Sequence, residues 1–460
     1  MSFEMLSAFA LYCLILCFIG FQAIKKSKKS ADYTLGNRSL NYWVTALAAQ
    51  ASDMGVWLFM GFPAAIYANG LSEAWVAVGL TFFMCLSWLL VAPKLRTTTE
   101  AYNSTTLPSF FEKRFNDTSG VLRIVSALFT LIFFMFYIAA SFVALGYLFG
   151  NIFGLSYVAG ISIGSLVVFY ILLGGFLSLA WIDTFQGFFL LSMLILVACT
   201  ALSHIGGLSA LSLTSGSQHS SGSIWGYLNI AIGWGLGYFG MPHVITKFMG
   251  IKDVREIKKA MIVGIAWQIV ALSTAVAIGL IGASFFTHGL VNKDLIFVMM
   301  TKELFNPFFT GIILCAIIAS TINNMGAQVL SCTSVLAEDF YSRFVNTKRK
   351  SVVSVQTASR IGVILICLSA FIFAYFNRGE SVYELVYYAW AGLGCSFGPL
   401  ILVSLHTKLS NRYAALAGIL GGGLTAGLLP YFTTDIKAMI PGFIVSFLCM
   451  GLVTAFSRQK

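Results

Sequence analysis

The chain has 460 residues, of which 58% are hydrophobic and only 10% are charged, and its formal net charge is +11. A soluble protein of this length needs more polar residues than this to cover its surface. The composition therefore argues against a water-soluble enzyme or binding domain. The positive charge does not indicate a nucleic-acid partner, because the basic residues gather in short connections between apolar stretches.

Long apolar stretches recur from one end of the chain to the other. Each has 18 or more residues, which is enough for an α-helix to cross a hydrocarbon core of about 30 Å. The sequence therefore predicts an all-α polytopic membrane protein, with residues 1–460 in a single domain. About thirteen transmembrane helices are expected, at 3–24, 41–69, 74–93, 122–150, 155–178, 183–203, 225–247, 260–286, 308–336, 354–376, 383–405, 411–431 and 438–457.

The basic residues predict how these helices are oriented. With the N-terminus outside, all but four of the 28 Lys and Arg residues fall on the cytoplasmic side, and the exceptions are Lys293, Lys302, Arg378 and Lys437. This asymmetry follows the positive-inside rule and places the C-terminus in the cytoplasm. The first span has its basic cluster after it and no small-residue cleavage site, so it is expected to be a retained helix.

The second span contains "AAQASDMGVWLFMGFPAA" at residues 48–65 and carries an acid near the centre of the membrane. Asp53 is followed by Gly55, Gly61 and Pro63, all of which weaken a helix. A carboxylate at this depth is costly and usually faces a partner or a watery cavity. Asp53 is therefore either part of a ligand site or a structural carboxylate that caps the amides of an interrupted helix.

A second acid, Asp183 in "LAWIDTFQG", stands at the start of the sixth span near the cytoplasmic side. Two roles remain open for it. It is either a helix N-terminal acid favoured by the helix dipole or a group on an ion path.

The seventh span is interrupted as well. Its residues 231–243, "AIGWGLGYFGMPH", contain four glycines and Pro242. Interrupted segments at matching positions of two five-helix halves indicate an inverted-repeat transporter, because the freed carbonyls and amides at the breaks bind ligands. The expected organisation is an extra helix and basic loop (1–40), a first repeat (41–203), a second repeat (225–405) and two C-terminal helices (411–457).

An enzyme is not expected. The nine cysteines lie within apolar spans without a CxxC pair, and the five histidines are scattered along the sequence. His243, beside Pro242, is better explained as part of the helix break than as a catalytic base.

Six blocks of the sequence resemble the sodium/solute symporter family, most closely its bacterial sodium/proline symporters. The likeness runs from about residue 31 to residue 457. The blocks are "DYTLGNRSLNYWVTALAAQASDMGVWLFMGFP" (32–63), "GLSEAW" (70–75), "LPSFFEKRF" (107–115), "GGFLSLAWIDTFQ" (174–186), "GWGLGYFGMPHVITKFM" (233–249) and "YAWAGLGCSFGP" (388–399).

This resemblance implies a fold of the leucine-transporter type, in which the second to eleventh spans form a 5+5 inverted repeat. It further implies a secondary active transporter in the bacterial inner membrane that takes up proline or a similar small amino acid with Na⁺, by alternating access. Membrane lipid surrounds such a carrier, and no obligatory protein partner is expected.

The resemblance also implies roles for single residues. Asp53 matches an acid needed for sodium-dependent transport, and the carbonyls of Ala51 and Met54 match ligands of a sodium site. Asp183 matches an acid associated with the ion path. The residues expected around the substrate are Asp53, Gly55, Trp57, Tyr137, Trp234, Tyr238 and Pro242. Tryptophan and tyrosine faces suit the apolar ring and the ammonium group of an imino acid.

Two departures from the family pattern concern the ligands. Where the family has a pair of hydroxyl side chains as sodium ligands on the ninth span, alignment on Gln328 gives Asn323 and Asn324. A shifted register with Ser320 and Thr321 is the alternative. Gly55 stands where proline carriers have a serine near the substrate. Two alternatives for the function therefore stay open: a carrier of the same fold for another small solute, with proton coupling or none, and a transporter-like sensor.

Overall fold

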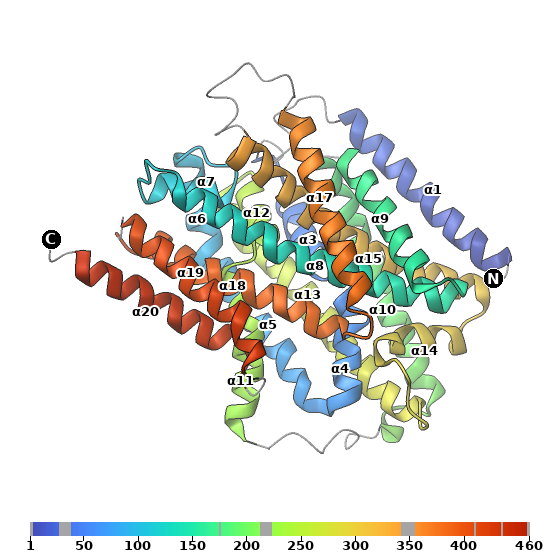
Figure 1. Cartoon of the computed structure of the whole chain (residues 1–460). Coiled ribbons are helices and arrows are strands. Elements are labelled where there is room, and N and C mark those ends of the chain that lie inside the picture. Colours follow the sequence, from blue (N-terminus) through green and yellow to red (C-terminus); the bar gives the residue numbers. More distant parts are fainter. Residues whose placement is uncertain are drawn as a thin grey trace.

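The computed structural model describes residues 3–26, 38–173, 176–211, 223–341, 355–408, 411–433 and 436–457. Within these ranges the chain is built from helices, and its strand-type pairing is limited to one isolated bridge between Leu40 and Ile251 (Figure 1). The longer helices are α1 (Phe3–Lys26), α3 (Tyr42–Asp53), α5 (Trp75–Leu86), α6 (Ala92–Ala101), α8 (Val121–Phe153), α9 (Tyr157–Leu173), α10 (Phe176–His204), α11 (Ile224–Gly235), α13 (Ile257–Phe285), α15 (Pro307–Ser334), α17 (Val355–Phe376), α18 (Val382–His406), α19 (Arg412–Leu428) and α20 (Met439–Ser457). The shorter elements used below are η2 (Val56–Leu58), α4 (Gly61–Asn69), η3 (Gly70–Ala74), α7 (Leu107–Arg114), η6 (Leu236–Phe239), α12 (Pro242–Gly250), η8 (Lys293–Leu295) and α14 (Ile296–Leu304).

In the described part of the chain, nine helical stretches are long and apolar enough to cross a membrane. They are Val56–Ala101, Val121–Phe153, Ile182–His204, Val254–Phe285, Pro307–Tyr341, Thr357–Phe376, Val382–His406, Arg412–Tyr431 and Met439–Ser457. The other expected spans coincide with α1, α9, the pair α11–α12 and the α3 part of the second span, whose described apolar portions are shorter or interrupted, while α4 falls within Val56–Ala101. An all-helical, multi-pass architecture is confirmed, and the number thirteen stays a prediction.

The short helix α3 lies at the centre of the molecule (Figure 1). Its residues from Val44 to Asp53 are all buried, and it packs against α10, α12, α13 and α15. The repeated alanines of this helix allow neighbouring backbones to approach closely, as small residues do at helix contacts in membranes. The expected acid therefore lies on an enclosed central element.

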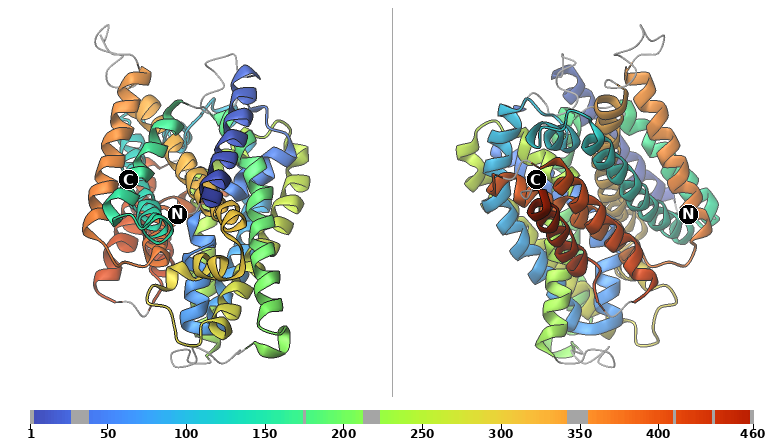
Figure 2. Two further views of the ribbon diagram at one scale, coloured as in Figure 1. Left: turned by 90° about the vertical axis from the view of Figure 1, so that its right-hand side faces the viewer. Right: turned by 60° about the vertical axis from the view of Figure 1, so that its left-hand side comes forward.

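The outer helices cover this centre from several sides. α1 packs against α15, whereas α19 and α20 pack against each other and against α18. α1 and α20 lie on opposite flanks of the molecule (Figure 1), and the long helices cross it at different tilts (Figure 2).

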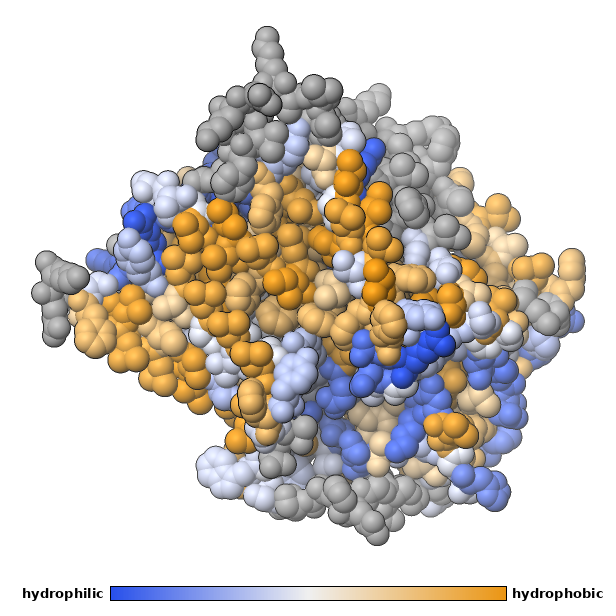
Figure 3. All heavy atoms as spheres, viewed as in Figure 1, coloured by the Kyte–Doolittle hydropathy of each residue, from blue (hydrophilic) through white to orange (hydrophobic). Residues whose placement is uncertain are grey.

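The surface divides into bands. On the face in Figure 3, apolar residues cover a broad area over α17, α19 and α20, while hydrophilic residues gather near α6 and α7 at one margin and near α14 at the opposite margin. Large apolar side chains such as Leu365 and Leu448 are more than half exposed there. A band of this kind suits contact with hydrocarbon between two polar interfaces.

Candidate functional site

The first helix break releases two backbone carbonyls. In a continuous helix, the N–H groups of Gly55 and Leu58 would donate to Ala51 and Met54. Instead, Gly55 N–H donates to the Asp53 carbonyl at 2.9 Å, and Leu58 N–H donates to the Gly55 carbonyl at 3.1 Å. α3 therefore ends at Asp53 and the helical path resumes in η2 and α4. The carbonyls of Ala51 and Met54, the two expected to hold a cation, thereby lose these helical donors.

The second break separates α11 from α12. Between them lie the 3₁₀ turn η6 and an extended residue, Met241. Pro242 then opens α12, at a position where its missing N–H costs nothing. Steric space requires a glycine at position 237, because a Cβ there would lie 2.1 Å from the indole nitrogen of Trp390. That nitrogen donates to the Trp234 carbonyl at 2.8 Å, so the glycine lets Trp390 hold the end of α11.

The two breaks meet through Asp53 and Tyr238. The Tyr238 hydroxyl donates to Asp53 Oδ2 at 2.5 Å, and both side chains are buried. Trp57 of η2 stacks on Trp234 of α11, with ring centroids 5.8 Å apart. The other carboxylate oxygen, Oδ1, is buried and has no hydrogen-bond partner in the described residues. The Asp53 side chain thus links the breaks and keeps one oxygen available.

A chain of glutamines supports this link from behind. Gln268 of α13 donates to the Tyr238 hydroxyl at 3.2 Å, and Gln50 of α3 donates to Gln268 Oε1 at 3.2 Å. Both glutamines are buried. Neither was predicted from the sequence, although a glutamine within an apolar span is itself a signal, because a buried amide must find partners.

Asn324 of α15 contacts the first break, and its role as a Na⁺ ligand stays a prediction. Its Nδ2 donates to the Ser52 carbonyl at 2.7 Å and to the Asp53 carbonyl at 3.2 Å. Gln328 Nε2 donates to Asn324 Oδ1 at 2.5 Å. The neighbouring Asn323 is buried, and neither of its amide atoms has a partner in the described residues.

Ser320 and Thr321, the pair in the alternative register of the ninth span, do not contact the break through their hydroxyls. The hydroxyls of Ser320 and Thr321 both donate to the Ile317 carbonyl of their own helix, at 2.8 and 2.7 Å. These two side chains therefore serve α15 itself, while Asn324 contacts the break.

Buried aromatic side chains surround the two breaks. Trp234 packs on Tyr383 and Tyr387 of α18, with ring centroids 4.8 and 4.9 Å away. Tyr137 of α8 lies near Asp53 and Asn324. Its hydroxyl is buried and has no hydrogen-bond partner in the described residues. The two α18 tyrosines were not predicted from the sequence. Their spacing of four residues on one helix face was the available signal.

Asp183 lies in a different place from Asp53. α10 begins at Phe176, so Asp183 is well inside the helix and not in its first turn, where the span was expected to start. Its Oδ2 accepts a hydrogen bond from Lys247 Nζ of α12 at 2.9 Å, and both side chains are buried. The acid therefore forms an ion pair with α12, the helix that follows the second break, and its role on an ion path stays a prediction.

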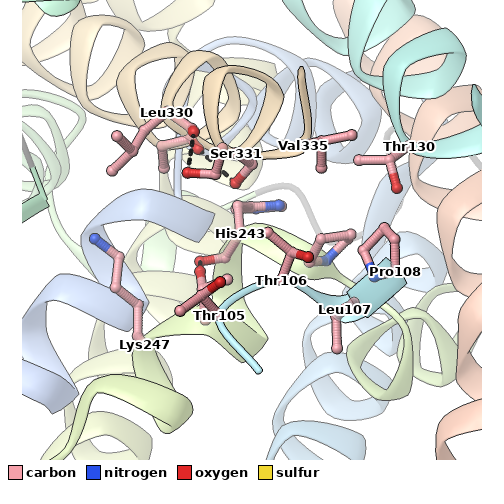
Figure 4. Close-up of a pocket in the computed structure, with 14 residues that line it drawn as sticks. Thr105, Thr106, Leu107, Pro108, Thr130, His243, Lys247, Leu330, Ser331 and Val335 are labelled. Atoms are coloured by element: carbon pink, nitrogen blue, oxygen red, sulfur yellow. Dashed lines mark hydrogen bonds between the residues drawn. The ribbon is translucent and has the colours of Figure 1, made fainter. Parts of the chain in front are cut away.

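Cavities flank the breaks. A narrow cavity of about 30 Å³ lies where α12 begins, and Figure 4 shows His243 between Ser331 and the threonines Thr105 and Thr106 that precede α7. A wider cavity of about 500 Å³ lies at the far end of α4 and is lined in part by Asp294. The wider cavity thus lies at the end of α4 away from the first break, and the narrow one lies at the start of α12.

Comparisons with known proteins identify relatives of this chain. The model of the sodium:solute symporter family matches residues 33–422. The osmoregulated proline transporter of Bacillus subtilis is 37% identical over 100% of this chain and 96% of its own length. The sodium/proline symporter of Escherichia coli is 38% identical over 100% of this chain and 95% of its own length.

The fold has solved counterparts as well. A Na⁺-coupled sialic acid symporter superimposes with a TM-score of 0.77 over 98% of both chains, at 17% identity. At this identity the likeness shows the fold alone, and the structural neighbours are transporters of the leucine-transporter type.

Proposed function

The chain belongs to the sodium:solute symporter family, and we propose that it takes up proline or a similar small amino acid together with Na⁺. It is a membrane transporter, not an enzyme. Relatives that bear the name of proline carriers match it over nearly their whole length, which supports proline as the substrate. The alternatives, a proton-coupled or uncoupled carrier of another solute and a sensor, have no support among these relatives.

One observation carries the proposal: the unpartnered Oδ1 of Asp53 lies buried between two helix breaks. A buried carboxylate oxygen without a partner is expensive. A cation or a substrate ammonium group near it removes this cost. The residues present therefore suit a positively charged ligand.

We assign Na⁺ to the first break. The carbonyls of Ala51 and Met54, whose helical donors are diverted, supply hard oxygen ligands, and Asp53 supplies negative charge nearby. Asn324 and Asn323 complete the candidate set from α15.

We assign the amino acid to the adjoining aromatic space. Trp57 and Trp234, with Tyr137 and Tyr238, are buried together around the breaks, and flat aromatic rings of this kind suit contact with a pyrrolidine ring. Gly55 precedes η2 and Pro242 opens α12, and neither helix start has a side-chain cap, so the N–H groups of these first turns suit a ligand carboxylate.

The wider arrangement extends the proposal. The two interrupted helices begin the halves 41–203 and 225–405, which we propose are inverted repeats that rock around the site for alternating access. The protein lies in the plasma membrane, in contact with lipid over its apolar band, and we propose an outside N-terminus and a cytoplasmic C-terminus.

Uptake of radiolabelled proline into proteoliposomes tests this function, with Na⁺ and proton gradients imposed separately. We expect accumulation above equilibrium with an inward Na⁺ gradient and none with a proton gradient alone. Accumulation that follows only the proton gradient would contradict Na⁺ coupling, and the absence of uptake under both gradients would contradict proline.

A further inference from the structure

Asp53 and Asp183 are both buried within the membrane-spanning part of the chain, but their partners differ. Oδ1 of Asp53 has no hydrogen-bond partner in the described residues, whereas Oδ2 of Asp183 lies 2.9 Å from the ammonium nitrogen of Lys247. A carboxylate buried in a membrane protein needs a positive charge beside it. In the proposed function Asp53 receives that charge from a ligand, but Asp183 already has it from the protein.

Lys247 is the only buried lysine in the part of the chain that the structure describes. Its side chain is 3% exposed and that of Asp183 is 2% exposed, so water and salt screen the pair little. Lysine is rarely buried to this extent unless it is paired. Its ammonium group carries the same unit charge as Na⁺, so it neutralises Asp183 without an ion from solution.

The side chain of Lys247 extends from α12 to α10, starting one helical turn after His243. Lys247 and His243 both line the narrow cavity at the start of α12. In Figure 4 the ammonium end of Lys247 points away from Thr105 and Thr106, which line the same cavity. The charge of Lys247 is therefore directed at Asp183 and not at the cavity threonines.

The ion pair also positions α12. This short helix packs against α3 and α6, and the pair with Asp183 links it to α10 as well. The first turn of α12 is where the substrate carboxylate is proposed to bind. A Na⁺ ion at Asp183 would have to displace Lys247 and would leave the ammonium group buried without its carboxylate, which is costly. The pair therefore keeps mobile cations away from this acid.

We propose that Lys247 is a cation built into the chain, which neutralises Asp183 permanently, anchors α12 to α10 and keeps Asp183 out of Na⁺ binding. This inference rests on the proposed Na⁺ coupling, because it states which buried acid does not hold the ion. Asp183 and Lys247 are then positioning residues. Each proline is accompanied only by the Na⁺ ion at the first break, so transport moves a single positive charge per proline.

A neutral pair of the same shape tests whether Asp183 is a Na⁺ ligand. In Asp183→Asn/Lys247→Gln neither charge remains, so neither is left buried without a partner. Na⁺ binding is measured by calorimetry in detergent, with choline as the control cation and no substrate. We expect a Na⁺ affinity within about threefold of the wild type, which is a small difference in free energy. A larger loss would make Asp183 a ligand and overturn the proposal.

Glu256→Gln/Lys259→Gln is the matched control, because it neutralises an ion pair of the same charges at an exposed place. Na⁺ binding should not change in this variant, and melting curves report whether each variant is folded. If the wild type itself binds no Na⁺, the proposed Na⁺ coupling fails. Na⁺ binding by the wild type that is lost in the neutral pair rejects only the built-in cation.

Chemical rescue tests the anchor. Lys247→Ala leaves Asp183 without its cation, so Na⁺-dependent binding of proline should fall by about tenfold or more. Ethylammonium has the size and charge of the missing end of the side chain and should restore binding, whereas ethanol should not. Lys247→Arg keeps a positive charge and should retain binding. Full binding by Lys247→Ala, or equal effects of ethylammonium and ethanol, would overturn the anchor.

The wild type alone provides a third test, which does not depend on the folding of any variant. The membrane potential at which Na⁺-driven proline flux reverses in proteoliposomes gives the charge moved per proline. We expect a single positive charge. A second charge per proline would mean that another cation is carried, which contradicts the proposal.

Discussion

At the scale of single residues, the hydrogen bonds of Asp53 distinguish a ligand role from a structural one. Oδ2 accepts the Tyr238 hydroxyl across the two breaks, and Oδ1 has no partner in the described residues. A carboxylate that capped the interrupted helix would accept backbone N–H groups instead. This pattern favours a ligand role and leads to the first prediction.

Replacing Asp53 by asparagine should reduce Na⁺-driven uptake by about tenfold or more while the protein stays folded. The amide keeps the shape and can still accept from Tyr238, but it removes the negative charge, and each 1.4 kcal/mol of lost attraction is a factor of ten. Uptake and melting temperature are compared with those of Asp253→Asn, a change at a loop acid whose bonds are local, to Arg255. Normal uptake with unchanged Na⁺ dependence would reduce Asp53 to a structural group.

Trp234→Ala and Tyr238→Ala should raise the apparent KM for substrate by about tenfold or more, because each removes an aromatic wall of the proposed pocket. Phe188→Ala is the control, since Phe188 lies on α10 with 54% of its surface exposed. Initial rates of uptake against proline concentration give KM for all three. Similar small changes in all three variants would place the substrate elsewhere.

Sequence reasoning selected Asp53, Trp234 and Tyr238 because an acid or a glycine-flanked aromatic is unusual in an apolar span. It could not select Gln268 or Tyr383 in the same way. The sequence marks them as polar side chains in apolar spans, but their importance comes from partners on other helices, which the sequence does not name. The distribution of buried polar atoms, which the structure supplies, is what marks them.

At the scale of elements, the first turn of α18 is hydrogen-bonded to a side chain from a turn that is distant in the sequence. Asp294 of η8 is buried, and its Oδ2 accepts the N–H of Val382 in the first turn of α18 at 3.1 Å. Burial raises the pKa of Asp294 to about 6, although this hydrogen bond acts to lower it. The folded protein therefore binds this proton more tightly than the unfolded chain does.

The sign of the resulting pH dependence follows from linkage. Because the pKa of about 6 in the folded state exceeds the ordinary value of 3.8, the contribution of Asp294 to stability is largest below the ordinary value and falls as pH rises through about 6. Melting temperatures in detergent should therefore decline from about pH 4.5 to about pH 7 more steeply in the wild type than in Asp294→Asn. Equal slopes in the two proteins would show that Asp294 is not the group responsible.

The two helix breaks were predictable as elements, because Gly and Pro interrupt apolar runs at both places. The start of α10 was not predicted. It lies at Phe176, before Asp183 and directly after Gly174 and Gly175, a helix-end signal that the expected span boundaries passed over. The Lys247 side chain that pairs with Asp183 is on another helix, so the burial of this acid could not be read from its neighbours in sequence.

At the scale of the whole molecule, the distribution of charge predicts which side each connection faces. Val291, near η8, and Arg255, before α13, both have highly exposed side chains. With the proposed orientation, a membrane-impermeant maleimide should modify Val291→Cys in intact cells. It should modify Arg255→Cys only after the membrane is opened, and the wild type provides the background from native cysteines. The reverse pattern would invert the topology.

Hydropathy predicted the all-helical membrane class well, because soluble proteins rarely contain repeated apolar runs of membrane length. It could not decide how many runs cross fully. α3–α4 and α11–α12 are interrupted where the ligands are proposed to bind, and length and composition do not distinguish a broken spanning helix from two short ones. Hydropathy also could not predict which helices pack around α3, because those contacts form between segments that are far apart in the sequence.

The central claim is that both breaks form one site in which Na⁺ and proline bind together. Calorimetric titration of proline in NaCl and in choline chloride, and of Na⁺ with and without saturating proline, tests this claim most directly. Because coupling between two ligands is reciprocal, we predict that each ligand strengthens binding of the other by the same factor, at least about fivefold. Proline affinity that is identical in Na⁺ and in choline would contradict the shared site.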